Sequence, residues 1–326
     1  MFGKSPVGAY IRVNHWMWNR LPPFVTACAL VRSYGELLHF LVRMQSQRGQ
    51  LRCTFFMRNP AALALIARLV ERSETDTLRV AVLGCSTGAE AYSVARSIRS
   101  ARPDMTLVLN AVDISREAVE VAKRGVYSFG VSSVSGTDVF DGMTQAEIDE
   151  LFDLSETEAT VKSWLRESIE WSVGDVRTPD VAAALGSQDI VVANNFLCHM
   201  EPSAAEQTLR NIARLVRPGG YLFVSGVDLS IRARVARDLG WIPIDELLEE
   251  IYHGDSRMHQ GWPFNYCSVE PMNKRKSDWK LRYSAAFVLT PSSDSAPIPV
   301  QPSAVSTASR YTALITAASA AIPLLS

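Results

Sequence analysis

Residues 79–93 (RVAVLGCSTGAEAYS) constrain the fold more than any other part of the chain. Residues 79–83 form a short β-branched, apolar run, which predicts a buried strand. Gly84 and Gly88 flank a sharp bend at which the backbone can come close to a ligand, and a helix is expected over 89–100. A strand, a glycine turn and a helix in this order are typical of the first half of a nucleoside-binding βαβ unit.

An acidic residue follows the next expected strand. Residues 106–112 are apolar and end at Asp113, a spacing typical of a carboxylate that binds ribose hydroxyls. The turn lacks the Gly-x-Gly-x-x-Gly of dinucleotide sites and the Gly-x4-Gly-Lys-Ser/Thr of triphosphate sites. Together with Glu90, Asp113 suits a ligand that has a free ribose and a cationic reactive end, and S-adenosylmethionine (AdoMet) is the common one. An ordinary βαβ turn with solvated acids is the alternative.

The order of the expected elements predicts an α/β protein with a parallel, doubly wound sheet. The strands are expected near 79–83, 106–112, 169–173, 189–193 and 221–225, with a closing strand over 278–289. Residues 1–75 are helical in pattern, with a helix over 34–48 and an irregular entry at Trp16, Trp18 and Pro22–Pro23, and they are expected to cap the cofactor cleft. Residues 76–290 would form the sheet domain, and 291–326, rich in Ser, Ala and Pro, a disordered tail.

Five segments in the chain also follow a known order. They are Thr54-Phe-Phe-Met-Arg58, residues 84–93, residues 111–115 with 122–127, residues 189–195 and residues 217–223. In order and in near-matching spacing they resemble the CheR-type chemotaxis receptor methyltransferases. The resemblance implies a Rossmann-like class I AdoMet methyltransferase fold with a small N-terminal helical domain. Members of this family convert receptor glutamate side chains into methyl esters, which implies a related transfer here.

The resemblance also assigns residues to the cofactor site. Together with the glycine turn, the set is Thr54, Arg58, Gly84, Gly88, Glu90, Asp113, Asp175, Val176, Asn194 and Asn195. Thr54 and Arg58 keep the spacing of the family motif that closes over AdoMet, and Asp175 and Val176 fall where the family contacts the adenine.

Two positions depart from the family pattern. Asn194 replaces the arginine of the family's Cys-Arg-Asn segment, and His199 stands where a tyrosine is usual. Both lie near the expected acceptor side, so they leave cofactor binding intact and leave the acceptor open. An acidic helix over 144–152 lies where the family carries a small insertion that holds its protein partner.

The chemistry of methyl transfer selects the catalytic candidates. A carboxylate acceptor is already ionised near neutral pH, so it needs no general base and only a positive group to position it. Arg58 is the candidate, since its planar fork can hold a carboxylate through two hydrogen bonds. A contact from Arg58 to AdoMet or to the cap is the alternative. His199 would be the base if the acceptor were a phenol or an alcohol.

Composition excludes several other classes of protein. The net charge of -1 gives no support to a nucleic-acid partner, and the five cysteines form no C-x-x-C pair. His253, Asp255 and His259 offer no clear ligand geometry, so no metal is expected. No segment reaches the roughly 20 apolar residues of a membrane span, and the N-terminus lacks the apolar core of a secretory signal. A cytoplasmic setting is therefore expected.

The sequence thus predicts an AdoMet-dependent O-methyltransferase that forms a carboxyl methyl ester and releases S-adenosylhomocysteine. The acceptor is either a protein glutamate or a small organic acid. Two alternatives remain open: a phenol or alcohol O-methyltransferase that uses His199 as its base, and a non-catalytic AdoMet-binding adaptor.

Overall fold

The computed structural model describes residues 6–26, 28–45, 54–129, 138–266 and 269–290. The expected tail over 291–326 lies outside the described residues. The helices are α1 Pro6–Trp18, α2 Pro23–Thr26, α3 Ala29–Gln45, α4 Pro60–Glu71, α5 Ala89–Ala101, α6 Arg116–Arg124, α7 Gln145–Leu151, α8 Ser163–Arg166, α9 Pro179–Leu185, α10 Pro202–Ala213, α11 Leu229–Asp238, α12 Leu248–His253 and α13 Trp279–Tyr283, with 3-10 turns η1 Leu197–His199 and η2 Ser256–His259. The strands are β1 Thr77–Leu83, β2 Thr106–Asp113, β3 Val126–Ser128, β4 Phe152–Leu154, β5 Glu158–Val161, β6 Ile169–Val173, β7 Gln188–Asn194, β8 Val216–Ser225, β9 Ile242–Pro243 and β10 Ala286–Val288.

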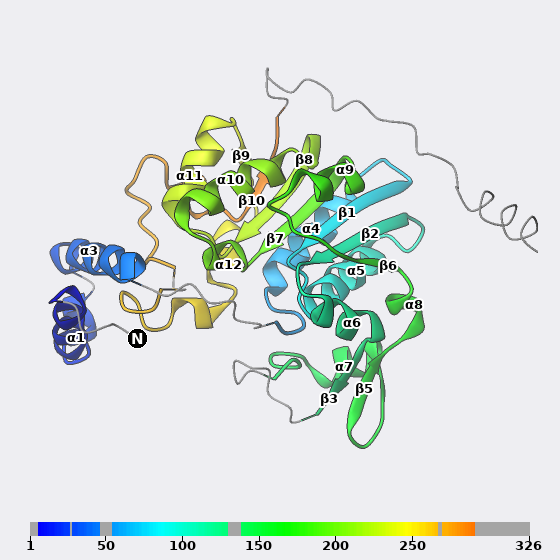
Figure 1. Ribbon diagram of the computed structural model, residues 1–326, viewed down its shortest axis with the longest axis horizontal. Coiled ribbons are helices and arrows are strands. Elements are labelled where there is room, and N and C mark those ends of the chain that lie inside the picture. The colour runs from blue at the N-terminus through cyan, green and yellow to red at the C-terminus, as the bar shows by residue number, and fades with distance from the viewer. Residues whose placement is uncertain (1–5, 27, 46–53, 130–137, 267–268, 291–326) are drawn as a thin grey trace, which may run out of the picture. The chain divides into compact units, whose positions relative to one another are not determined.

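The centre of the fold is a seven-stranded sheet in the order β6-β2-β1-β7-β8-β10-β9. The first five strands of this order are parallel, and β10 pairs antiparallel with β8 and β9. Figure 1 shows helices on both faces of this sheet. The five parallel strands were all predicted from apolar runs, and the α/β, doubly wound prediction is confirmed.

The alternation of side chains along β1 divides the core into two layers. Val80 and Val82 pack with α4 and α5 in one hydrophobic cluster, whereas Ala81 and Leu83 pack with α9, α10 and α11 in another. All four side chains are fully buried. A strand that is buried on both faces has apolar residues at successive positions, and residues 80–83 follow this pattern. The sequence therefore predicted the strand correctly.

A second, three-stranded antiparallel sheet, in the order β3-β5-β4, lies within residues 126–161. The helix expected over 144–152 is α7, which Thr144 begins with a capping box: its hydroxyl accepts from the Glu147 N–H while the Glu147 carboxylate accepts from the Thr144 N–H. The small sheet and α7 occupy the part of the chain where the resemblance predicts a small insertion.

Helix α4 falls within the segment 1–75 but packs on the main sheet. Its apolar face, Leu65, Ile66 and Val70, belongs to the same cluster as Val80 of β1. The helix begins at Asn59, whose side-chain oxygen accepts from the Ala62 N–H at 3.1 Å, and Pro60 occupies its first turn. The cap and the proline therefore define where α4 starts, directly after Arg58.

Two expectations about local structure were wrong. Trp16 and Trp18 lie in helix α1, so the irregular entry is confined to the residues around Pro22. The expected closing strand over 278–289 is two elements, helix α13 and then strand β10. Alternating apolar residues suggested a strand, but Arg282 and Tyr283 both bond to the carboxylate of Glu270, and this tertiary contact favours a helical turn.

Among the described residues, the helices are too short or too polar to cross a bilayer.

Candidate functional site

A pocket of about 400 Å³ opens at the carboxyl ends of β1, β2, β6 and β7. The strand order changes direction between β1 and β7, and open α/β sheets bind ligands at such a point. We call this the larger pocket. It is lined by every predicted site residue except Gly88, namely Thr54, Arg58, Gly84, Glu90, Asp113, Asp175, Val176, Asn194, Asn195 and His199.

The bend after β1 depends on glycine. Gly84 has a φ of 70°, and a Cβ there would lie 2.6 Å from the Phe196 ring, so neither the backbone conformation nor the space admits a side chain. Its N–H donates to Val112 O at 2.8 Å, which ties the bend to β2. Gly88 differs from the prediction: a Cβ there would lie 2.9 Å from Ala122 and Trp171, so this glycine lets the start of α5 pack closely and does not line the larger pocket.

Asp113 ends β2 and organises the loops around it. Its Oδ2 accepts from the Ser86 N–H and its Oδ1 from the Ser115 N–H, both at 2.8 Å. Ser115 in turn caps α6, because its hydroxyl accepts from the Ala118 N–H. The carboxylate thus holds the loops after β1 and β2 together, and each oxygen keeps a lone pair for a ligand.

Glu90, at the start of α5, and Asn194, at the end of β7, meet in the wall of the larger pocket. The Asn194 Nδ2 donates to Glu90 Oε1 at 2.8 Å. Burial raises the pKa of Glu90, and the bond from Asn194 and the charge of Arg58 oppose this shift only in part. A cationic ligand stabilises the ionised form of such a buried carboxyl, because the ligand supplies the missing countercharge.

Asp175 is paired within its own loop. Arg177 donates to both of its carboxylate oxygens, through Nε at 2.9 Å and Nη2 at 2.6 Å. These bonds lower the pKa of Asp175 and keep it ionised. Arg177 also lines the larger pocket, and the sequence analysis missed it although it lies only two residues away.

The residues just before Arg58 position its backbone. Phe56 is fully buried and packs edge-on against Tyr127 and Phe152, with ring centroids at 5.2 and 5.0 Å. Met57 has a left-handed φ of 54°, and its N–H donates to Ser93 Oγ at 3.0 Å. The backbone is therefore held in place one and two residues before Arg58. This fixes the point from which the Arg58 side chain extends.

A second pocket, of about 120 Å³, adjoins the larger one, and we call it the smaller pocket. The two share the residues Arg58, Glu90, Asn194 and Asn195. The lining of the smaller pocket includes apolar side chains, among them Ile66, Val94, Val192, Phe223 and Ile251. No described residue before Thr54 lines the larger pocket, whereas His39 and Arg43 of α3 line the smaller one.

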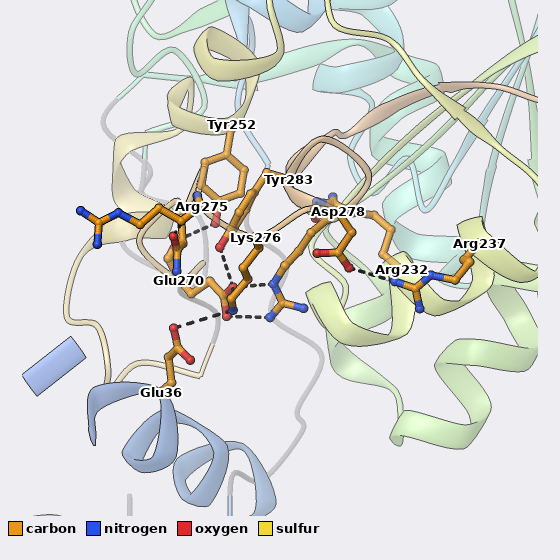
Figure 2. Close-up of polar contacts among 11 residues, drawn as sticks. Glu36, Arg232, Arg237, Tyr252, Glu270, Arg275, Lys276, Asp278 and Tyr283 are labelled. Atoms are coloured by element: carbon orange, nitrogen blue, oxygen red, sulfur yellow. Dashed lines mark hydrogen bonds and ion pairs between the residues drawn. The ribbon is translucent and has the colours of Figure 1, made fainter. Parts of the chain in front are cut away.

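A buried polar cluster supports one wall of the smaller pocket. Glu270 accepts two bonds from Arg282, at 2.6 and 2.8 Å, and one from the Tyr283 hydroxyl at 2.9 Å, and Figure 2 shows Glu270 at the centre of these contacts. Burial alone would raise the pKa of Glu270, but these bonds outweigh it and hold the pKa below its usual range. Arg232 donates to Val224 O and Arg282 O, and burial lowers its pKa to about 10. These bonds tie α11 and α13 to the end of β8.

Two further features indicate that the larger pocket is built for a polar ligand. The hydroxyl of Ser86 is buried and has no hydrogen-bond partner within the described part of the chain. Ser86 and Asn195 both have left-handed backbone conformations, with φ of 49° and 60°. Strained residues and unsatisfied buried polar atoms of this kind concentrate at ligand sites.

His199 lies in η1 and lines the larger pocket, half-buried. His253 and His259 lie close together, with ring centroids at 4.9 Å, but Asp255 is paired with Arg58. Within the described ranges, no three His, Cys, Asp or Glu side chains are grouped as metal ligands would be.

The structure also adds residues that the sequence analysis did not assign to the pockets. Phe55, Ser86, Ser115, Arg177 and Phe196 line the larger pocket, and Tyr266 lines the smaller one. Phe55 lies beside Arg58, with 5.1 Å between the guanidinium carbon and the ring centroid. Their positions at the ends of predicted strands were the only sequence signal that could have found most of them.

The sheet order and the pocket at its switch point define the class of protein as a Rossmann-like, class I AdoMet methyltransferase fold. Residues 52–231 match the family described as CheR methyltransferase, SAM binding domain, and the match covers more than half of the chain. The chain belongs to this family, and the predicted resemblance is confirmed. AdoMet is accordingly the cofactor that this domain binds.

The relatives share this domain but differ in length. A probable biofilm formation methyltransferase WspC from Pseudomonas putida is 31% identical over 195 residues, which cover 57% of this chain and 44% of the relative. The WspC of Pseudomonas aeruginosa is 26% identical, with 64% and 48% covered, and chemotaxis protein methyltransferase 1 of the same species is 25% identical, with 61% and 76% covered. The aligned part of the chain spans about half the length of the two WspC relatives.

Proposed function

We propose that this chain transfers the methyl group of AdoMet to the side-chain carboxylate of a protein glutamate and forms a methyl ester. The observation that carries the proposal is that Arg58 lines both pockets, with Glu90 and Asn194 beside it. A guanidinium at the junction of two pockets can hold an acceptor carboxylate against a donor on the other side. The name of the relative called chemotaxis protein methyltransferase 1 supports a protein acceptor.

The larger pocket fits AdoMet on the chemistry of its residues. The carboxylate of Asp113 would hold the ribose hydroxyls, the buried Ser86 hydroxyl lies beside it, and Glu90 would receive the ammonium group. AdoMet supplies an electrophilic methyl group on a sulfonium.

The acceptor's oxygen then needs only to be held in line with that methyl group and shielded from water. Arg58 would hold the carboxylate through paired hydrogen bonds, and no side chain has to remove a proton, because a carboxylate is ionised at neutral pH. Thr54, Gly84, Val176 and Asn195 would complete the cofactor contacts, and Asp175 and Arg177 would border the adenine.

A small organic acid is the second candidate acceptor. The apolar side chains in the lining of the smaller pocket favour it, because they would bury the body of an acid whose carboxylate lies on Arg58. The two candidates share the reaction and differ only in the acceptor.

The test of the function is to incubate the protein with methyl-labelled AdoMet and, separately, with the protein fraction and the small-acid fraction of its source extract. We expect label in the protein fraction that mild alkali releases as volatile methanol, which marks an ester. Label in the small-acid fraction would transfer the proposal to the second candidate. A product stable to alkali would favour His199 acting as a base on a phenol or alcohol, and tight AdoMet binding without any turnover would indicate an adaptor.

The raised pKa of Glu90 predicts proton-linked binding of AdoMet. The ammonium group binds the ionised carboxylate, and burial raises the pKa of Glu90 in the free protein, so binding should release a proton wherever the free carboxyl is protonated. AdoMet affinity should therefore rise with pH up to the pKa of Glu90, by up to about tenfold per pH unit. Calorimetry in two buffers of different ionisation enthalpy measures the release.

Glu90→Gln should remove both the proton release and the pH slope, while Glu120→Gln, an exposed change on α6, should leave them unchanged. Proton release that persists in Glu90→Gln would contradict this role.

A further inference from the structure

Arg58 already holds a carboxylate of this chain. Its Nε donates to Asp255 Oδ2 at 2.7 Å, and the side chains of Arg58 and Asp255 are only 18% and 11% exposed. Arg58 lines both pockets, whereas Asp255 lines only the smaller one. The Asp255 carboxylate thus lies on the acceptor side of the arginine, where the proposed function places the carboxylate of the acceptor.

The segment that carries Asp255 is docked on the residues next to Arg58. Asn59 Nδ2 donates to Ile251 O at 2.8 Å, at the end of α12. Gly254 follows α12, and a Cβ at this position would clash with the Asn59 side chain, so only glycine lets the chain approach this closely. Asn59 is fixed in turn as the N-cap of α4. Asp255 reaches Arg58 because of this local fit, although the two lie 197 residues apart in sequence.

We propose that Asp255 is an exchangeable carboxylate, which binds Arg58 between turnovers and yields it to the carboxylate of the acceptor. The inference rests on the proposed function. Two carboxylates at one guanidinium repel each other, so an acceptor that binds the same arginine weakens its bond to Asp255. Asp255 then turns away by rotation of its own side chain, while Asn59 keeps the backbone of α12 in place.

The exchange also explains how the methyl ester leaves Arg58 after the transfer. Methylation removes the negative charge of the acceptor, and a neutral ester cannot compete with an ionised carboxylate for a guanidinium. Asp255 therefore returns to Arg58 once the ester has formed and favours its departure. Asp255 also competes with other acids for Arg58. An acid that makes no further contact with the smaller pocket is excluded, because its carboxylate alone does not displace the tethered carboxylate of Asp255.

The test measures carboxylate binding without turnover, so that it stands apart from the ester assay. Glutarate is titrated by calorimetry into the protein saturated with S-adenosylhomocysteine. We expect Asp255→Asn to bind glutarate about tenfold more tightly than the unchanged protein, because the internal competitor has lost its charge. Gly254→Ala should act in the same direction, because its methyl group displaces Asp255 from Arg58.

Two controls frame the measurement. Asp245→Asn removes a carboxylate that pairs with Lys280 on the surface and should leave glutarate binding unchanged. Arg58→Ala should abolish the tighter binding in the Asp255→Asn background.

Two results would overturn the exchange. Glutarate affinity that is unchanged, weaker or undetectable in Asp255→Asn, with its melting temperature preserved, would show that Asp255 does not compete for Arg58. Tighter binding that persists without Arg58 would place the anion elsewhere. Failure of the proposed function is a separate outcome, since it appears as absence of an alkali-labile ester whatever glutarate does.

Discussion

Asp113→Ala is expected to weaken AdoMet binding by at least about a hundredfold. The ribose would lose two charge-assisted hydrogen bonds, each of which contributes about 1.5–3 kcal/mol. The same change also removes the acceptor for the Ser86 and Ser115 N–H groups, so the loops after β1 and β2 lose their common anchor. Calorimetric titration with AdoMet and with S-adenosylhomocysteine measures the loss.

The matched control for this change is Asp104→Ala. Asp104 also lies beside β2, just before the strand begins, but it is exposed and pairs with Arg102 away from the pockets. Its substitution should leave both affinities unchanged. If Asp113→Ala retains full affinity for both ligands, the ribose assignment is wrong, and with it the reading of the pocket as a nucleoside site.

Arg58→Ala should lower kcat by about 10²- to 10³-fold while AdoMet affinity falls much less. The proposed role of Arg58 is to hold the acceptor carboxylate in line with the methyl group, and loss of such positioning acts on turnover. Arg58→Lys should recover only part of the rate, because an ammonium group lacks the planar fork that binds both carboxylate oxygens.

Arg68→Ala is the matched control for Arg58. Arg68 lies on the neighbouring helix α4, is largely exposed and pairs with Glu246. It should leave kcat unchanged. An AdoMet affinity that falls as much as kcat in Arg58→Ala would instead make Arg58 a cofactor residue, which was the alternative role considered for it.

Local sequence patterns were sufficient for the strands and for the turns that follow them. Residues 80–83 are apolar because this part of β1 is buried on both faces, and Asp113 stands at the carboxyl end of the parallel strand β2, at the edge of the sheet where the site lies. These features depend on neighbours in sequence. The same is true of the capping box at Thr144, which marks the start of α7.

Contacts between segments far apart in the sequence could not be predicted from local patterns. Asn194 meets Glu90 and Asp255 meets Arg58 across 104 and 197 residues. The helix α13 was mistaken for a strand because its conformation depends on Glu270, which lies outside the pattern that suggested the strand. The predicted cofactor residues came from the family motifs, whereas no motif pointed to Asp255 as the partner of Arg58.

The sequence by itself determined a doubly wound sheet, a glycine bend, and an acidic residue at the end of the second strand, because burial and backbone geometry impose these patterns within a few residues. Only the tertiary structure determined that Arg58 lines two pockets. It also determined that the carboxylate of Asp255, in the segment after α12, binds Arg58. Such contacts arise from the packing of α4, α5 and α12 on one face of the sheet, and no local pattern carries that information.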